Sequence, residues 1–500
     1  MRDLPQRAPF VLFAGYLCLG LAWLGSNPPA AAPEEPEHYL RALAIGLGDL
    51  VGQPTSMTPM LPTNAAQAAH LTRVTRSVLV PPGLEVPPSW FCTVANHQAS
   101  ARCLTTTVAN RTSVRQATNE AGSLPYLYVP SGLAMRLAGN ATQALFLARL
   151  ANAVIAYSLL LAAVVLLWDG GSAVSMLGLP VAVTPMVLFV GTAIGPSGPE
   201  VAASAAFLAF LLRLTRRAEA PRWAWVAGIS AGAVLTLARP LGPFWMVSLV
   251  LVAVALAGRA QVAAVARRAP HALTIGACGL VAAAAMNLGW AFFFFPPAAH
   301  SASELAGFLL PSLASVPEAV GEAIGVFGWQ DTLMPRLMYG VWGIAWIMLM
   351  APALLRGTLR ERRTLDALVL GAGAAIVLVS ALVVIPVGFA VQGRHILPIF
   401  LALPLVAGEV LYRNRDRVGP PTLAWLAAVT GTLAALVQLS GWYANAHRYA
   451  VGTAGPWLFL GSADWNPVGG WATWFALAAG GSALLVFAAF AAYRSRLNAL

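Results

Sequence analysis

Lysine is absent from the chain, and all thirty basic residues among its 500 are arginine. Charged residues of both signs are scarce as well: they make up 10% of the chain, against about 25% in soluble proteins, whereas 58% of the residues are hydrophobic. Without lysine there is no glycine-rich phosphate loop, and the His-Glu-x-x-His and Cys-x-x-Cys motifs are missing too. These absences exclude an ordinary soluble domain and the chemistries of those motifs.

Several hydrophobic runs exceed the roughly 18 residues that mark a membrane-spanning helix. We predict one all-α, multi-pass membrane domain over residues 1–500, with a long external loop at 26–142 and a short tail at 493–500. The first run could instead be a cleaved signal peptide, because arginines precede a short apolar core and a Pro/Ala-rich stretch follows it. The twelve predicted spans are 9–25, 143–168, 173–194, 200–214, 223–238, 241–257, 272–294, 337–355, 366–388, 396–412, 421–440 and 471–492.

The arginines are distributed unevenly among the loops. Eighteen of the thirty lie in every second loop and at both termini, together with seven acidic residues; the other loops hold twelve arginines and twelve acidic residues. By the positive-inside rule, this bias places both termini in the cytoplasm. The net charge of +11 therefore indicates topology rather than a nucleic-acid partner. The composition, rich in Ala, Gly, Pro and Arg, suggests a bacterial genome of high GC content, and we predict that the protein lies in the bacterial cytoplasmic membrane.

Only four cysteines are present. Cys92 and Cys103 both lie in the long external loop, where disulfides persist, and their separation of eleven residues would close a small ring. We predict a disulfide between them; the alternative is two free thiols. Cys18 and Cys278 fall inside predicted spans and are typical of small core residues.

The external loop begins with an acidic cluster, "PEEPEH". Glu34 and Glu35 stand between Pro33 and Pro36, which restrict the backbone around them. Two carboxylates held at the bilayer surface suit a general base or a metal ligand, and His38 could share their pocket. The alternative is a solvated charge run with no chemical role.

The residues after this cluster have helical periodicity. Four apolar side chains share one side of the expected helix: Tyr39, Leu43, Leu47 and Leu50. This pattern predicts a helix lying on the membrane surface, with Glu34 and Glu35 at its N-terminal end, where the helix dipole favours anions.

The stretch "PEEPEHYLRALAIGLG" resembles the signature of a bacterial family of predicted membrane proteins, domain of unknown function 2142. The signature includes His38 and Arg41, but its aspartate is Glu34 here. Other stretches match the family in order: "LPYLYVPSGLAMRLAG", "ARLANAVIAY", "VTPMVLFVGTAIGPSGPE", "ARPLGPFW", "FGWQDTLMPR" and "VQGRHILPIF". The last departs from the family at His395, where an aromatic residue is usual.

This family is similar in layout to the GT-C class of membrane glycosyltransferases, which carry an acidic motif in a long first external loop. The resemblance implies transfer of a sugar from a polyprenyl-phosphate donor to an envelope glycan, lipid or protein. We expect Glu35 to be the base, because it matches the signature without substitution and desolvation would raise its pKa. Glu34 would then orient the acceptor or help to bind Mg²⁺ or Mn²⁺.

Cations are needed to stabilise the leaving phosphate, and arginine matches phosphate oxygens with two parallel hydrogen bonds. Arg394, beside Gln392 on a short external turn, is the first candidate, and Arg239 is the second. Either arginine, like Arg149, could instead only anchor its helix at the interface. Glu200 and Asp331 lie at external helix ends, where they could bind acceptor hydroxyls or an ion, or simply cap the helices.

Two other classes of function stay open. A transporter or flippase for a lipid-linked sugar would place charges or broken helices near the middle of the membrane. If the protein instead assists envelope assembly without catalysis, Glu34, Glu35 and Arg394 have no chemical role. The polar candidates instead gather at external helix ends, which favours an enzyme.

Overall fold

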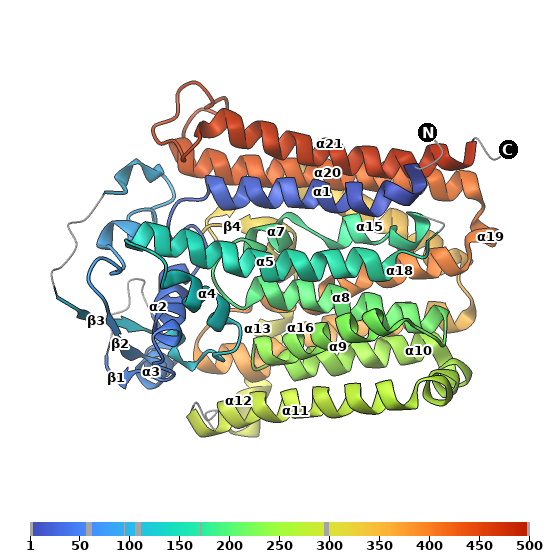
Figure 1. The fold of residues 1–500 in the computed structure, drawn as a ribbon, viewed down its shortest axis with the longest axis horizontal. Coiled ribbons are helices and arrows are strands. Elements are labelled where there is room, and N and C mark those ends of the chain that lie inside the picture. The colour runs from blue at the N-terminus through green and yellow to red at the C-terminus, as the bar shows by residue number, and fades with distance from the viewer. Residues whose placement is uncertain are drawn as a thin grey trace.

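The computed structural model describes residues 4–56, 63–94, 96–105, 112–170, 173–294 and 300–497. Arg2 and Asp3, which entered the charge count, and residues 498–500 of the predicted tail lie outside these ranges. The described chain is mainly a bundle of long helices, and both ends of the chain lie at the same end of this bundle (Figure 1). The segment that joins the first two spans caps the opposite end.

Ten helices in the described ranges are long and apolar enough to cross a membrane. They are α1 (Leu4–Ser26), α5 (Ala141–Leu167), α8 (Ser197–Arg216), α10 (Gly242–Arg268), α11 (Pro270–Phe294), α15 (Arg336–Arg356), α16 (Leu359–Val379) with its short continuation to Val387, α17 (Gly393–Phe400) with α18 (Ala402–Arg413), α20 (Pro420–Val451) and α21 (Gly470–Leu497). The multi-pass, all-α fold class is therefore confirmed, although α21 extends into the predicted tail.

The other two predicted spans are irregular. Residues 173–194 form helices α6 (Leu179–Ala182) and α7 (Pro185–Gly191), which belong to a pair of segments bent by 78°. Pro185 explains the break, because a proline disfavours helical backbone at the residue before it. Residues 223–238 form α9 (Arg222–Ala238), a helix of only 17 residues. The structure thus has ten long apolar helices, or eleven with the bent pair, where we predicted twelve spans.

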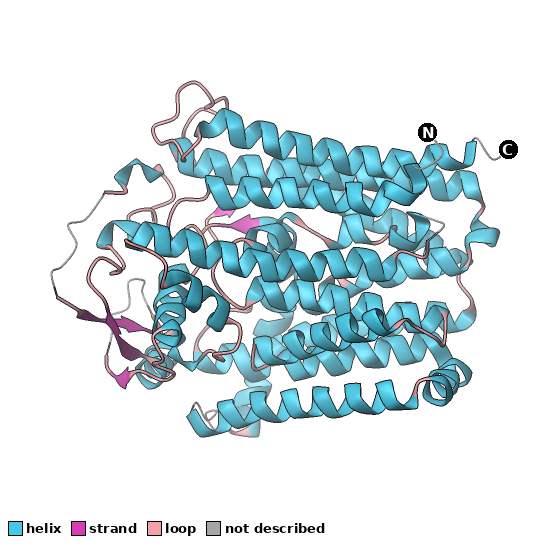
Figure 2. Cartoon of the chain, viewed as in Figure 1, coloured by secondary structure: helices cyan, strands magenta, loops and turns pink. Residues whose placement is uncertain are grey.

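The described parts of the segment 26–142 contain strands that we did not predict (Figure 2). Strands β1 (Gln53–Pro54), β2 (Arg76–Val80) and β3 (Val114–Thr118) form an antiparallel sheet in that order, with Val78 opposite Gln116. The same segment contains α2 (Glu35–Gly46), α3 (Ala65–Val74) and α4 (Tyr128–Met135). Of these, α2 packs on β2 and β3, and α4 packs on α2. After α11, the short helices α12 (Ala302–Gly307), α13 (Leu309–Ala314) and α14 (Val316–Gly325) and the hairpin of β4 (Val326–Phe327) and β5 (Thr332–Leu333) precede α15.

Helix α2 is not a surface helix, and this prediction is wrong. Every residue from Glu35 to Gly46 is buried, because α4 and the sheet pack against the helix. Tyr39 donates a hydrogen bond to the carbonyl of Leu84, 2.8 Å away. Leu47 and Leu50, which were expected to continue its apolar side, lie beyond its end and are exposed. The N-terminus of α2 is consequently fixed within the protein rather than by lipid.

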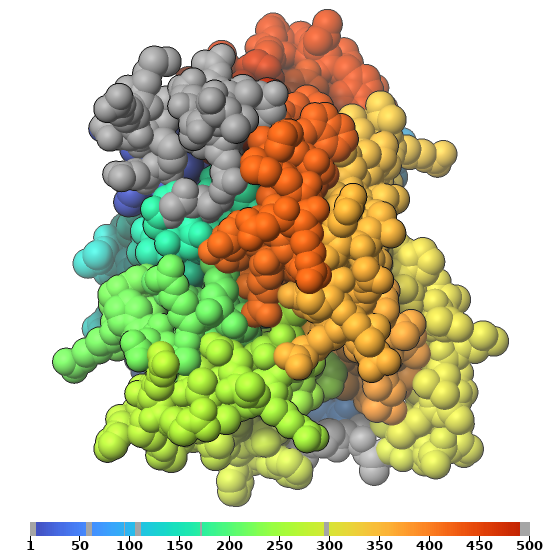
Figure 3. Space-filling model, turned by 90° about the vertical axis from the view of Figure 1, so that its right-hand side faces the viewer, coloured from blue at the N-terminus to red at the C-terminus, as the bar shows by residue number. Residues whose placement is uncertain are grey.

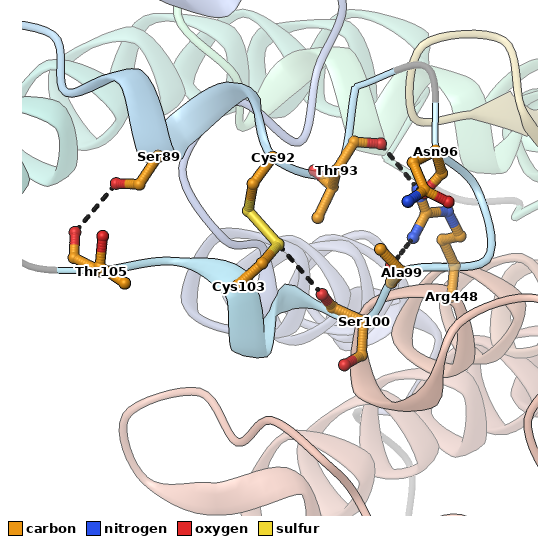
Figure 4. Close-up of a disulfide and its surroundings, with 9 residues drawn as sticks. All are labelled: Ser89, Cys92, Thr93, Asn96, Ala99, Ser100, Cys103, Thr105 and Arg448. Carbon is orange, nitrogen blue, oxygen red and sulfur yellow. Dashed lines mark hydrogen bonds between the residues drawn. A yellow bond between two sulfur atoms is a disulfide. The ribbon is translucent and has the colours of Figure 1, made fainter.

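Cys92 and Cys103 form a disulfide, with their Cα atoms 6.0 Å apart. Arg448, which belongs to α20, also contacts the loop between them (Figure 4). Arg448 donates hydrogen bonds to the carbonyls of Thr93 and Ala99, among others in this loop. The disulfide and one buried guanidinium therefore fix the same segment.

Removing the disulfide should destabilise the segment that joins the first two spans. A closed ring of this size stabilises the folded state by about 3 kcal/mol, because it restricts the unfolded chain. We expect Cys92→Ser/Cys103→Ser to lower the unfolding temperature in detergent and to make this loop sensitive to protease. Cys278→Ser is the matched control, since this cysteine is free and exposed. Equal stability of the double variant and the control would contradict the prediction.

Candidate active site

A cavity of about 310 Å³ lies between the segment 26–142 and the adjoining ends of the spans. Its polar lining residues include Glu34, Glu120, Glu200, Arg239, Gln392, Arg394 and His395. Its apolar lining residues include Leu241, Trp245, Val383, Val384 and Phe389. The cavity can therefore accept a ligand that has both a charged and a hydrophobic portion.

Glu34 and Arg394 meet in this cavity although 360 positions separate them in the chain. Nη2 of Arg394 donates to Oε2 of Glu34 at 2.6 Å, and the Glu34 side chain remains 26% exposed. Burial raises the pKa of Glu34, but the charge and hydrogen bond of Arg394 outweigh it, so the pKa lies below its ordinary value. Glu34 is therefore ionised at neutral pH.

The backbone of Glu34 is strained. It precedes α2 in the left-handed conformation, with φ of 60° and ψ of 14°, and its side chain caps no backbone N–H. A non-glycine residue in this region costs on the order of 1–3 kcal/mol and is typical of functional sites. This conformation belongs to the residue whose carboxylate reaches the cavity and Arg394.

His38 lies one turn into α2. Its Nδ1 is 2.7 Å from the hydroxyl of Tyr128 and 3.5 Å from Oε2 of Glu120. Burial lowers the pKa of His38, so the ring is neutral at pH 7. The ring passes close to Gly195, where an added Cβ would lie 3.0 Å from His38 Cδ2, so this position favours glycine.

Glu34, His38 and Glu120 could together hold a metal ion. One ligand atom from each lies within 4.8 Å of the others. Carboxylate oxygens suit Mg²⁺ or Mn²⁺, whereas the imidazole also suits Zn²⁺. Such an ion would compete with Arg394 for Glu34, because that carboxylate already forms an ion pair.

The Gln392–Arg394 turn is anchored by a residue that sequence reasoning did not identify. Oε2 of Glu322, in α14, accepts a hydrogen bond of 2.6 Å from the backbone N–H of Gly393. A Cβ at Gly393 would lie 2.2 Å from the Ala323 nitrogen, so only glycine allows this approach. This close contact fixes the start of α17 and therefore the position of Arg394.

Glu200 and Arg239 also line the cavity, as a second ion pair. Their closest atoms, Nε of Arg239 and Oε2 of Glu200, are 3.4 Å apart. Arg239 also donates to the hydroxyl of Ser197 at 2.6 Å. Both oxygens of Glu200 are buried and accept no hydrogen bond from a described residue. The two charges therefore attract each other without a hydrogen bond between them.

Glu35 does not line the cavity, and this part of our prediction is not supported. Its side chain is fully buried and forms two hydrogen bonds with Arg149, of 2.7 and 2.6 Å. Arg149 also donates to the backbone carbonyls of Asn27 and Pro28. This pair connects the end of α1, the start of α2 and the middle of α5, so a structural role explains both residues.

Two further candidates lie away from the cavity. Arg41 is buried and donates to the backbone carbonyls of Ser123 and Leu50, so it positions the loop that contains Ser123, a cavity residue. Asp331 forms an ion pair of 3.2 Å with Arg448 beneath the disulfide loop. Neither residue has the position expected of a substrate ligand.

The fold and the cavity define a multi-pass α-helical membrane protein with an amphiphilic pocket at one end of its helices. The chain belongs to the family of predicted membrane proteins DUF2142, whose model matches residues 17–403; this confirms the membership indicated by the motifs. No curated protein matches the sequence. The crystal structure of ArnT from Cupriavidus metallidurans in the apo state is similar, with 13% identity and a TM-score of 0.44, over 96% of this chain and 76% of that one. A likeness this weak says nothing about activity.

Proposed function

We propose that the protein transfers a sugar from a polyprenyl-phosphate donor to an acceptor of the cell envelope, at the external face of the bacterial cytoplasmic membrane. The observation that carries the proposal is the Glu34–Arg394 pair in a cavity with an apolar wall. A lipid-linked donor has a matching division between a charged phosphate and a hydrocarbon chain. The arginine-rich end, which holds both termini, would face the cytoplasm.

The reaction requires one proton transfer and one exchange of bonds at the sugar. The acceptor oxygen forms a bond to the anomeric carbon while the bond from that carbon to the phosphate oxygen breaks. The Glu34 carboxylate takes the acceptor's proton, and the polyprenyl phosphate leaves with the bonding electrons. Arg394 and Arg239 stabilise the charge on that phosphate. Glu34 replaces Glu35 in this role because only Glu34 reaches the cavity.

A divalent ion held by Glu34, His38 and Glu120 would supply further positive charge near the leaving phosphate. Arg239 and Arg394 also line this cavity. Removal of divalent ions with a chelator would test how far these arginines suffice.

Transport of a lipid-linked sugar is the alternative, and the bent pair at residues 173–191 is the feature that favours it. The helices at this bend contain no ionisable residue, however, and the Thr184 hydroxyl is bonded to the carbonyl of Ala323. Membranes from a strain without the protein would separate the two functions. A transferase defect leaves the donor accumulated on the external face, whereas a transport defect leaves it on the cytoplasmic face.

Replacing Arg394 should impair donor use and also change the pH profile. Arg394→Lys should retain only part of the activity, since lysine cannot form two parallel hydrogen bonds with phosphate. Arg394→Gln should raise the pKa of Glu34, because the largest effect that lowers it is removed. As the pH is lowered, this variant should lose activity at a higher pH than the wild type does, because its Glu34 is protonated at a higher pH. Transfer assayed against pH in membranes would measure both effects.

Arg336→Gln is the matched control for this series, because Arg336 is exposed at the start of α15 and does not line the cavity. It should keep the wild-type rate and pH profile. An Arg394→Gln variant with lower activity and an unchanged acid limb would argue against Glu34 as the base.

A further inference from the structure

A second cavity, of about 480 Å³, lies at the opposite end of the bundle, beside the termini. Figure 3 looks onto this end of the molecule. Five arginines line the cavity: Arg213, Arg216 and Arg217 at the end of α8, Arg413 at the end of α18, and Arg415 in α19 (Arg415–Val418). The cavity is therefore concave and strongly basic, and it is separate from the candidate active site.

A buried carboxylate orients two of these arginines. Glu409 accepts hydrogen bonds from Arg216, at 2.5 and 2.8 Å, and from Arg413, at 2.8 Å. Arg216 also lies over the ring of Tyr412, with its guanidinium carbon 4.4 Å from the ring centroid. These contacts hold the two guanidiniums in place before any ligand arrives.

The other three guanidiniums form no ion pair with a described residue. Within the described part of the chain, the guanidinium of Arg213 donates only to the carbonyls of Leu166 and Trp168, and that of Arg415 only to the carbonyl of Tyr412. Arg217 is exposed, and its guanidinium makes no hydrogen bond with a described residue. Most of their N–H groups are therefore available to an external acceptor.

The charges in and behind the cavity wall do not balance. Five arginines face three carboxylates, those of Asp169, Glu361 and Glu409, which leaves an excess of two positive charges. A phosphate group offers the complementary charge, and its oxygens match the geometry of guanidinium donors. The positive-inside rule explains why arginines are frequent at this end of the bundle. It does not explain why they converge on a cavity around a buried carboxylate.

We propose that this cavity binds a phosphate group at the membrane face that carries the termini. Its volume lies within the range of small-molecule sites. Two sources share this chemistry: the headgroup of an anionic lipid, which basic pockets between helices recognise, and a soluble phosphorylated compound. The site is distinct from the transferase cavity and does not depend on the proposed function.

The test is a thermal-unfolding titration of the full-length protein in an uncharged detergent. The probes are dioctanoyl phosphatidylglycerol, inorganic pyrophosphate and, as a zwitterionic control, dioctanoyl phosphatidylcholine. The variant Arg217→Gln/Arg415→Gln removes two donors without an ion-pair partner. Its matched control, Arg356→Gln/Arg363→Gln, removes the same charge from exposed positions outside the cavity.

We expect one anionic probe to stabilise the wild type and the control variant, and its apparent Kd to rise about tenfold or more in the cavity variant. A response to the lipid alone assigns a headgroup, and a response to pyrophosphate alone assigns a soluble phosphate. If the double variant does not fold, the exposed Arg217→Gln substitution alone should weaken binding several-fold. The proposal is overturned if no anionic probe stabilises the protein, or if both double variants lose binding equally.

Discussion

Glu34→Gln should reduce sugar transfer by about a hundred- to ten-thousand-fold, the usual cost of removing a positioned general base. The variant should still fold and insert, because the Glu34 side chain is partly exposed and glutamine keeps an oxygen for Arg394. Transfer from a lipid-linked donor in isolated membranes, normalised to the amount of folded protein, would measure the effect. Among single substitutions in this cavity, we expect it to have the largest effect on rate.

Two further variants make this result specific. Glu34→Asp keeps the carboxylate and introduces the residue of the family signature, so it should retain much of the activity. Glu37→Gln removes a nearby carboxylate from the first turn of α2, but that residue does not line the cavity. Burial raises the pKa of Glu37 to about 7, so much of it is already protonated at neutral pH. Near-normal transfer by Glu34→Gln would show that the strained backbone at this position has another cause.

The linear sequence predicted the spans well because membrane-spanning helices are visible as apolar runs. Eleven of the twelve predicted segments correspond to the ten long helices or to the bent pair, and the twelfth corresponds to the shorter α9. The small sheet was missed because β1 has only two residues, and β2 pairs with a strand more than thirty positions away. The sheet is stabilised by packing on α2. No local sequence pattern predicts this contact between separate segments.

The candidate site was predicted only in part, and the reason is the backbone at the start of α2. Glu34 lies before the helix in the left-handed conformation, and Glu35 is the first helical residue. Glu34 therefore lines the cavity, whereas Glu35 is bonded to Arg149. The motif identifies the two carboxylates but not which of them turns inward. Glu120 and Glu322 were not identified either, because each reaches the site from a separate segment and belongs to no recognisable motif.

Glu35 forms a buried ion pair with Arg149, and the second prediction with a large expected effect concerns this pair. Glu35→Gln should destabilise the protein by about 3–5 kcal/mol, since removing one partner of a buried ion pair leaves the other charge uncompensated. Both side chains are at most 2% exposed, so water cannot replace the lost partner. The backbone N–H of Ile194 donates to the Glu35 carboxylate at 3.3 Å, and in the variant its acceptor would be a neutral amide instead of a charged carboxylate. We therefore expect a low yield of folded protein and a lower unfolding temperature in detergent.

A double-mutant cycle separates this structural role from a catalytic one. Arg149→Gln should be destabilising on its own, but Glu35→Gln/Arg149→Gln should be less unstable than the sum of the two single changes, because neither charge is then left unpaired. Activity per folded molecule should stay close to wild type in Glu35→Gln. A Glu35→Gln protein with wild-type stability and no transfer would reverse the assignment: Glu35 would be the base, and the ion pair with Arg149 would have to open during the reaction.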